Sequence, residues 1–307
     1  MQPIIVNSLN KTYGNGQVTA VKDVSFTVNE NELFGLIGPD GAGKTSIFRI
    51  LTTLLLADSG TAKVAGFDVV TGYREIRQRV GYMPGRFSLY PDLTIEENLA
   101  FFATIFDTSI EENYHLIRDI YIQIEPFKKR RAGKLSGGMK QKLALCCALI
   151  HKPEVLFLDE PTTGVDPVSR KEFWEMLGRL KSGGITILVS TPYMDEASLC
   201  DRIALMQSGS IMTIDTPEAL TGSYPDPLFA ISTEKASMPS ILNALAQFEK
   251  TKSHYAFGEF AHASFTDKNL SADDIIGYLD SRGITNSRIN LIKPTIEDRF
   301  IQLATQK

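Results

Sequence analysis

Cysteine is scarce in this chain, and its three cysteines do not have the spacing of a metal or redox site. Cys146 and Cys147 are adjacent, and Cys200 lies far from them in the sequence. An odd number that includes an adjacent pair is typical of a reducing compartment, where cysteine behaves as a small apolar residue. The cysteines therefore predict neither a disulfide framework nor a metal centre.

Long apolar runs and an excess of positive charge are also missing. No stretch approaches the roughly 18 apolar residues that span a bilayer, and the N-terminal Met1–Val6 lacks the basic region and apolar core of a signal peptide. The formal net charge of −4 gives no general attraction to nucleic acid or to an acidic membrane. We therefore expect no nucleic-acid partner, and any membrane role must come through another protein. The 307 residues can form one large domain or two unequal ones.

One glycine-rich stretch carries a specific signal. Gly38-Pro39-Asp40-Gly41-Ala42-Gly43-Lys44-Thr45 has the pattern of a phosphate-binding loop. An apolar strand is expected before it, over Glu32–Gly38, and a helix after it, over Ser46–Leu56. Glycines let the backbone N–H groups point inward around anionic oxygens, and the helix start adds partial positive charge. Lys44 would neutralise the β- and γ-phosphates and Thr45 would ligate Mg²⁺. A plain glycine-rich turn is the simpler alternative.

The segments around this loop indicate an α/β core with a helical insertion. Residues 3–30 and 61–83 have the alternation and turns of short strands. After Pro84 the pattern becomes helical, with capping boxes at Thr94–Glu97 and Ser109–Glu112 that open helices to about Phe106 and Ile124. The basic run Lys128–Arg131 is interpreted as a solvated corner rather than as a phosphate-contacting surface.

The core resumes with two buried strands. Val155–Leu158 and Ile185–Val189 are continuous apolar runs, as expected for strands covered on both faces of a parallel sheet. Helices are expected at Ser169–Leu180 and at Asp195–Cys200. The alternation of strand and helix predicts a mainly parallel sheet.

The composition changes at Tyr224–Pro227, which is interpreted as a linker. The expected elements beyond it are strand 228–233, helix 238–249, two strands around Gly258, helix 271–282 and strand 287–292, the order of a small split βαβ domain, followed by a helix at 295–304. We therefore predict a nucleotide-binding domain at 1–222, with a helical subdomain at about 84–150, and a small α+β accessory domain at 228–307.

Two acidic residues end the first buried strand. Asp159 and Glu160 would fall at the carboxyl edge of the sheet, next to the phosphate-binding loop. Asp159 would hold Mg²⁺, through water, and Glu160 would polarise the attacking water as a general base. A charged pair that merely ends a strand is the alternative.

A second glycine motif, Leu135-Ser136-Gly137-Gly138-Met139, precedes the helix expected at Lys140–Ile150. It exposes the N–H groups of a helix start. The phosphate-binding loop, Leu-Ser-Gly-Gly and Leu-Asp-Glu-Pro, in this order and spacing, resemble the nucleotide-binding domain of ATP-binding cassette (ABC) transporters over residues 2–222. Tyr13 matches the family's adenine-stacking aromatic, and Thr163–Pro167 matches the loop after the catalytic Glu.

Two further segments resemble one branch of that family. Lys134–Gln141, which contains the Leu-Ser-Gly-Gly motif, is similar to the drug-resistance and type-2 exporter branch, and so is Lys293–Phe300 near the C-terminus. The resemblance implies a P-loop NTPase fold of the ABC type. It also implies a head-to-tail dimer in which each ATP lies between one domain's phosphate-binding loop and the other's Leu-Ser-Gly-Gly motif. The helical unit would transmit closure to the membrane subunits.

The pattern and the resemblance together give a set of site residues for ATP and Mg²⁺. We expect Glu160 and Lys44 to be catalytic, and Thr45 and Asp159 to be metal ligands. The expected nucleotide-binding residues are Tyr13, Gly38, Pro39, Asp40, Gly41, Ala42, Gly43, Lys44, Thr45, Ser46, Ser136, Gly137 and Gly138.

The chain departs from the family pattern at two positions. Gly85 stands where the family has a Gln that joins Mg²⁺, water and the helical unit, and Pro192 stands where it has a His that contacts the γ-phosphate. The following Tyr193–Ala197 keeps the alignment in register. Neither Gly85 nor Pro192 offers a polar side chain, and Pro192 has no N–H. We expect a site that binds ATP but hydrolyses it slowly, since losing one transition-state donor costs about a hundredfold or more in rate. The alternative is that both substitutions are harmless because a neighbouring residue compensates for the lost side chains.

Three functions are compatible with these residues. The leading one is the ATP-binding subunit of an ABC exporter, cytoplasmic and docked on the membrane through separate permease subunits, with a second cassette as homo- or heterodimer partner. The second is a mainly regulatory subunit that lends its Ser136–Gly138 motif to a competent partner cassette. The third, a soluble cassette protein acting on ribosomes or DNA, is disfavoured because the chain has one cassette and no long coiled coil.

Overall fold

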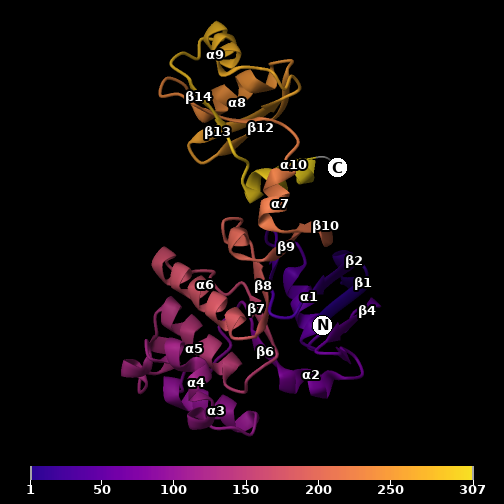
Figure 1. The fold of residues 1–307 in the computed structure, drawn as a ribbon, viewed down its shortest axis with the longest axis vertical. Helices are drawn as coiled ribbons and strands as arrows, with labels where there is room; N and C mark the ends of the chain where they lie inside the picture. The colour runs from indigo at the N-terminus through magenta and orange to yellow at the C-terminus, as the bar shows by residue number, and fades with distance from the viewer. Residues whose placement is uncertain (1, 306–307) are drawn as a thin grey trace. The chain divides into compact units, whose positions relative to one another are not determined.

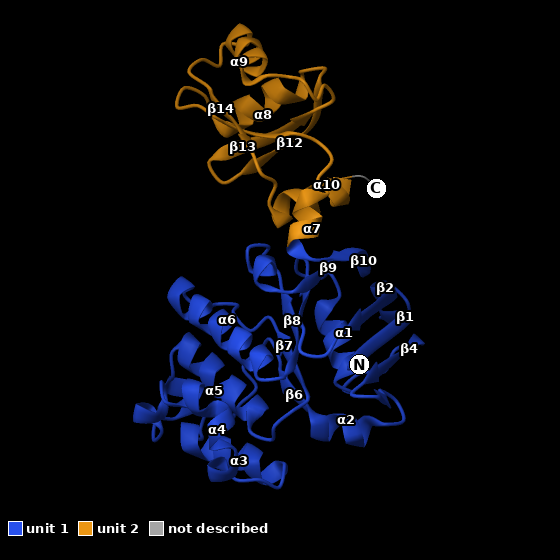
Figure 2. Cartoon of the chain, viewed as in Figure 1, with its two compact units in different colours: residues 1–217 blue, residues 218–307 orange. Residues whose placement is uncertain are grey.

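The structure is a computed structural model that describes residues 2–305. It divides into two compact units, residues 1–217 and 218–307 (Figure 2). The helix α7 (Pro217–Gly222) therefore falls almost entirely in the second unit. No helix within residues 2–305 is long and apolar enough to cross a membrane.

The first unit is built on a six-stranded sheet in the order β10-β9-β3-β8-β7-β6 (Figure 1). The strands are β3 (Leu33–Ile37), β6 (Val80–Met83), β7 (Val155–Asp159), β8 (Thr186–Thr191), β9 (Arg202–Gln207) and β10 (Ser210–Asp215). Neighbouring strands from β9 to β6 are parallel, and β10 runs antiparallel to β9. The prediction of a mainly parallel sheet is confirmed. All residues of β3, β7 and β8 are buried, as their continuous apolar runs require.

An antiparallel sheet covers the other side of the phosphate-binding loop's helix. Its strands are β1 (Ile4–Tyr13), β2 (Val18–Val28), β4 (Ser59–Val64) and β5 (Phe67–Asp68), in the order β2-β1-β4-β5. The helix α1 (Lys44–Leu51) lies between the two sheets, because Ile47 and Phe48 are buried in one core with Val24 of β2 and Phe157 of β7. Packing on both sides fixes the helix that follows the loop.

The helical region comprises α3 (Ile95–Ile105), α4 (Ile110–Tyr121) and α5 (Gly137–Leu149), and α6 (Pro167–Ser182) follows β7. The capping box at Thr94 is confirmed, because its side chain accepts from Glu97 N and its own N–H donates to the Glu97 carboxylate. The second box is only half formed. Ser109 Oγ accepts from Glu112 N, but the Glu112 carboxylate accepts from Thr108 Oγ1 instead.

In the first unit, one helix was missed and another was predicted too long. A short helix α2 (Tyr73–Arg79) lies where strands and turns were expected. Because Ile76 is its one buried residue, the sequence shows no helical repeat of apolar residues there. The helix after the phosphate-binding loop ends at Leu51 rather than at Leu56. Thr53 has a left-handed backbone with φ of 64°, and a helix does not continue through such a residue.

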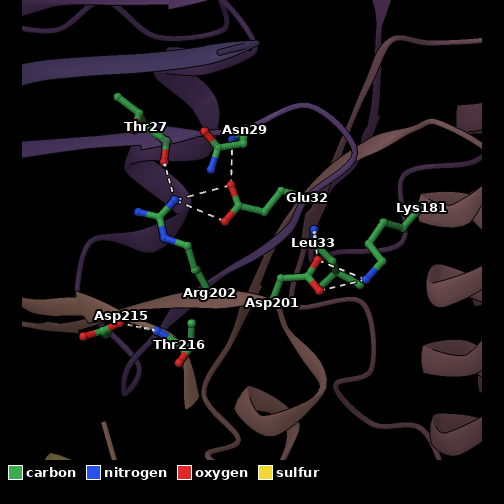
Figure 3. A network of polar contacts seen from close by, with 9 residues as sticks. All are labelled: Thr27, Asn29, Glu32, Leu33, Lys181, Asp201, Arg202, Asp215 and Thr216. Atoms are coloured by element: carbon green, nitrogen blue, oxygen red, sulfur yellow. Dashed lines mark hydrogen bonds and ion pairs between the residues drawn. The ribbon is translucent and has the colours of Figure 1, made fainter. Parts of the chain in front are cut away.

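A polar network joins the amino ends of β3 and β9 to α6 (Figure 3). The buried carboxylate of Glu32 accepts from Arg202 Nη1 at 3.1 Å and from Asn29 N at 2.6 Å. Asp201 accepts from Leu33 N at 2.9 Å and from Lys181 Nζ at 2.8 Å. These contacts fix the edge of the sheet that is opposite the phosphate-binding loop.

The second unit is an α+β domain. Its elements after α7 are β11 (Leu228–Ser232), α8 (Met238–Ala246), β12 (Thr251–Phe257), β13 (Phe260–Phe265), α9 (Ala272–Ser281), β14 (Arg288–Ile292) and α10 (Ile296–Thr305). The strands form an antiparallel sheet in the order β12-β13-β11-β14. Ile241 of α8 and Ile275 of α9 are buried in one core with Phe229 and Ile231. The unit therefore has a hydrophobic core of its own.

Candidate nucleotide-binding site

The phosphate-binding loop connects β3 to α1, and two of its glycines are required by close backbone packing. A Cβ on Gly38 would lie 2.3 Å from the Met206 carbonyl oxygen, and one on Gly43 would lie 2.1 Å from that of Ala20. Gly43 also has φ of 100°, which side chains rarely adopt. The loop is therefore clamped between β2 and β9, and its curved backbone presents N–H groups to an anion.

Lys44 is the first residue of α1, and its side chain turns back over the loop. Its buried ammonium group donates to Gly38 O at 2.8 Å and to Pro39 O at 3.1 Å. It also lies 3.3 Å from Glu160 Oε1. The structure thus brings together the loop, its lysine and the carboxylate that the sequence proposes as the general base.

Asp159 ends β7 and Glu160 follows it, so both lie at the carboxyl edge of the sheet. Asp159 is almost fully buried, and Glu160 has a left-handed backbone with φ of 51°. Burial and then the Asp159 charge raise the pKa of the neighbouring Tyr82 to about 12, so that phenol is neutral at ordinary pH. The negative charge in this part of the site therefore comes from the carboxylates.

Ser190 is a site residue that sequence reasoning missed. Its hydroxyl is fully buried, donates to Asp159 Oδ1 at 2.6 Å and accepts from Glu160 N at 3.0 Å. It thereby orients both acidic residues. The available signal was its place at the end of β8, the strand between β7 and β3, but nothing in the sequence alone shows that pairing.

Tyr13, at the end of β1, borders the start of α1. Its hydroxyl is hydrogen-bonded to Ser46 Oγ at 3.1 Å, while the side chain remains partly exposed. Lys11 Nζ lies 5.9 Å from the centre of the Tyr13 ring. The side chain thus lies next to the first turn of α1, the helix that follows the loop. Thr45 is half-buried at the first turn of α1, and Asp40 is exposed at the tip of the loop.

The glycine motif before α5 is placed apart from the loop. Ser136 is exposed and caps α5, accepting from Met139 N at 3.3 Å. A Cβ on Gly137 would lie 3.3 Å from Gly164 O, and one on Gly138 would lie 2.9 Å from Ser169 Oγ. This helix start therefore packs on the segment after Glu160. No hydrogen bond described within residues 2–305 joins Ser136–Gly138 to the phosphate-binding loop.

The two unusual positions differ in what they adjoin: Gly85 lies beside the carboxylates, and Pro192 follows a residue that is hydrogen-bonded to the loop. A Cβ on Gly85 would come within 3.0 Å of Asp159 O and 3.7 Å of Glu160 Cβ. Pro192 follows Thr191, whose carbonyl accepts from Gly38 N at 3.3 Å.

A glycine loop with an inward lysine, next to two carboxylates at the carboxyl edge of a parallel sheet, defines a P-loop nucleotide-binding domain. Residues 21–163 match the model of the family described as ABC transporter. The chain belongs to the ABC transporter family, and the resemblance seen in the sequence is confirmed.

Two curated relatives and one solved structure illustrate this membership. The chain is 37% identical to "Probable multidrug ABC transporter ATP-binding protein YbhF" of Escherichia coli K12, over 98% of this chain and 52% of that protein. It thus spans about half the length of this relative. It is 34% identical to "Daunorubicin resistance ATP-binding protein DrrA2" of Streptomyces coeruleorubidus, over 96% of this chain and 93% of that protein.

The solved structure supports the fold. It is the dimeric ATP-binding cassette MJ0796 in a post-hydrolysis state with ADP and Pi, with a TM-score of 0.63 and 24% identity. The match covers 69% of this chain and 98% of that chain. The P-loop NTPase fold of the ABC type, predicted from the motifs, is thereby confirmed.

Proposed function

We propose that this chain is the ATP-binding subunit of an ABC exporter, which couples ATP binding and hydrolysis to transport through a separate membrane permease. The observation that carries this proposal is the position of Lys44, surrounded by Gly38 O, Pro39 O and Glu160. The relatives' names, which specify multidrug transport and daunorubicin resistance, favour drug-like small molecules as cargo. Its place would be the cytoplasmic face of the membrane.

The residues at the site fit MgATP. The loop amides and Lys44 would hold the phosphates, and Tyr13 would stack on adenine. Thr45 and Asp159 would hold Mg²⁺, which suits this ion because it is usually bound by one or two protein oxygens together with phosphates and water. Bound Mg²⁺ would neutralise charge on the phosphate oxygens. Glu160 would take the proton of the attacking water, and Ser190 would keep both acidic residues oriented.

A second cassette would complete the site. Ser136–Gly138 form a capped, exposed helix start that lies on α5 rather than at the phosphate-binding loop. Such a start attracts an anion, and within a head-to-tail dimer it would face the ATP on the other chain. The solved cassette MJ0796 is described as dimeric. Because Gly85 and Pro192 leave this chain's own pocket without two polar groups, the best partner is a cassette that is complete at both positions.

An apolar groove supports docking of the permease. It has a volume of about 420 Å³ and lies between α3, α5 and the segment after β6. Leu54, Phe87 and Ile105 line it and are exposed. Exposed apolar side chains around a groove are suited to receive a segment of a partner protein. We propose that a cytoplasmic segment of the permease occupies it, and we propose no nucleic-acid partner.

The test of nucleotide binding is Lys44→Ala. MgATP affinity of the purified chain, measured by titration calorimetry, should fall by most of its binding free energy, because the β- and γ-phosphates lose their cation. Lys129→Ala is the matched control, since Lys129 is a largely exposed lysine in the helical region and should leave affinity unchanged. Undiminished binding by Lys44→Ala would refute the assignment of the loop. Capture of the native complex should recover a membrane permease and a second cassette.

A further inference from the structure

A buried carboxylate that the mechanism does not use lies behind the site. Glu196 begins the short 3-10 helix Glu196–Leu199 and is only 2% exposed. Its Oε1 accepts from Thr162 Oγ1 at 2.7 Å, and its Oε2 accepts from Thr191 Oγ1. Both threonines are fully buried. A buried carboxylate is costly unless it is hydrogen-bonded and paired, so this arrangement depends on all its partners.

Arg170 of α6 supplies the countercharge. Its Nε lies 3.5 Å from Glu196 Oε1, and its guanidinium lies 4.2 Å above the ring of Tyr193. Glu196 therefore connects three segments that are distant in sequence: the segment after Glu160, the end of β8, and α6.

The hydrogen bonds to Glu196 fix the orientation of the Thr162 and Thr191 hydroxyl groups. An ionised carboxylate only accepts hydrogen bonds, so each threonine must donate to it. Thr191 Oγ1 also accepts from Tyr193 N at 3.1 Å, which fixes the backbone just after Pro192. Each threonine side chain is thus held in one orientation by Glu196.

The segments that Glu196 connects also contact the residues proposed to bind and hydrolyse ATP. Thr163 N donates to Glu160 O at 3.3 Å, and Thr191 O accepts from Gly38 N. On the other side, Gly164 O lies against Gly137 of the motif before α5. Glu196 is therefore placed to influence the general base, the residue at position 192 and the motif offered to the second cassette.

We propose that Glu196 is a positioning residue for ATP hydrolysis, acting through Thr162 and Thr191. This inference rests on the proposed function, because it needs an ATP pocket around Lys44 and Glu160. Glu196 touches neither Lys44 nor the phosphate-binding loop in any contact described, so it should affect hydrolysis much more than nucleotide affinity.

The test is a double-mutant cycle of Glu196→Gln and Thr162→Val in the full chain. Each change keeps the side-chain volume and removes the charge or the hydroxyl. With protein in excess over ATP, the single-turnover rate should fall about tenfold to a hundredfold for each, as for other residues that orient catalytic groups. The double variant should be no slower than the slower single variant, because both remove the same link. MgATP affinity should be unchanged.

A second readout does not depend on activity. Hydrogen exchange of the amides at 160–166 should become faster in Glu196→Gln, while that of α1 stays as in the wild type. The matched control is Asp195→Asn. Asp195 lies 3.9 Å from the same Arg170 but is largely exposed, and this variant should behave as the wild type in every assay.

The outcomes separate this inference from the proposed function. If the wild type binds no MgATP, the proposed function fails. If it binds and hydrolyses MgATP, and Glu196→Gln does so at the same rate, only the positioning role of Glu196 fails. Additive rate losses in the double variant, or a rate loss that merely follows a lower fraction of folded protein, would also overturn it.

Discussion

At the scale of single residues, Gly85 and Pro192 are the two positions where the chain lacks the polar side chains of the family pattern. Gly85 lies beside Asp159 and Glu160, and Pro192 follows Thr191, whose carbonyl accepts from Gly38 N of the loop. Gly85 is also tightly packed, because a Cβ at this position would come within 3.0 Å of Asp159 O. The surrounding backbone therefore leaves little room for a side chain at position 85. We propose that the pocket binds ATP but lacks two transition-state donors.

Gly85→Gln combined with Pro192→His should therefore raise ATP hydrolysis by the purified chain. We expect a gain of about tenfold, below the hundredfold that one donor can contribute, because the new Cβ at position 85 must displace its neighbours. Steady-state phosphate release measures the rate. Gly85→Ala is the matched control: it introduces the Cβ without the amide and should bring no gain. A double variant no faster than the wild type would count against the slow-site hypothesis.

The sequence predicted residues whose role depends on a local motif and missed those whose role depends on pairing. The phosphate-binding loop can be read from eight consecutive residues, and the structure places Lys44 and Glu160 3.3 Å apart. Ser190 and Glu196 act through contacts with residues about thirty positions away. No single sequence shows which strand ends will be neighbours, so these two could not be found before the sheet order was known.

At the scale of elements, strand and helix predictions were best where burial leaves a clear signal in the sequence, either a continuous apolar run or a helical repeat of apolar residues. The buried strands β3 and β7 and the amphipathic α4 were found, whereas α2 was missed because Ile76 is its one buried residue. The sheet also depends on polar contacts that no repeat of apolar residues in the sequence predicts. The Glu32–Arg202 pair links the amino ends of β3 and β9 from positions far apart in the sequence.

Breaking that pair should destabilise the first unit. Arg202→Met keeps most of the side-chain length but leaves the buried Glu32 carboxylate with only the Asn29 amide among the contacts seen here. Loss of one partner of a buried pair typically costs about 3–5 kcal/mol, and we expect about 2–3 kcal/mol because Arg202 is nearly one-third exposed. Urea unfolding of the full chain measures this.

An exposed pair provides the control for that measurement. Arg79 and Glu75 form an i,i+4 ion pair on α2 with both side chains well exposed. Solvent screens such exposed pairs and they contribute little to stability, so Glu75→Gln should barely change the unfolding midpoint. If Arg202→Met were as mild as Glu75→Gln, the Glu32 network would not fix the edge of the sheet.

At the scale of the whole molecule, the chain joins two units with separate cores. Residues of the nucleotide-binding site, from Tyr13 to Pro192, all belong to the unit that ends at residue 217. The second unit has a buried polar centre of its own, in which the Asp298 carboxylate accepts from Tyr255, His262 and Thr295. Within residues 2–305, the contacts that build the site all join residues of the first unit. We propose that this unit serves dimerisation or regulation rather than catalysis.

A fragment that ends at Ser223 should therefore fold and bind MgATP with the affinity of the full chain. The reason is that the loop, α1 and both covering sheets are complete within it, and the boundary at residue 217 leaves their core intact. Calorimetric titration of the fragment and the full chain makes the comparison, and size-exclusion chromatography with light scattering compares their self-association. We expect equal affinity and weaker association in the fragment. A fragment that is soluble and folded by circular dichroism but does not bind MgATP would show that the second unit contributes to the nucleotide site.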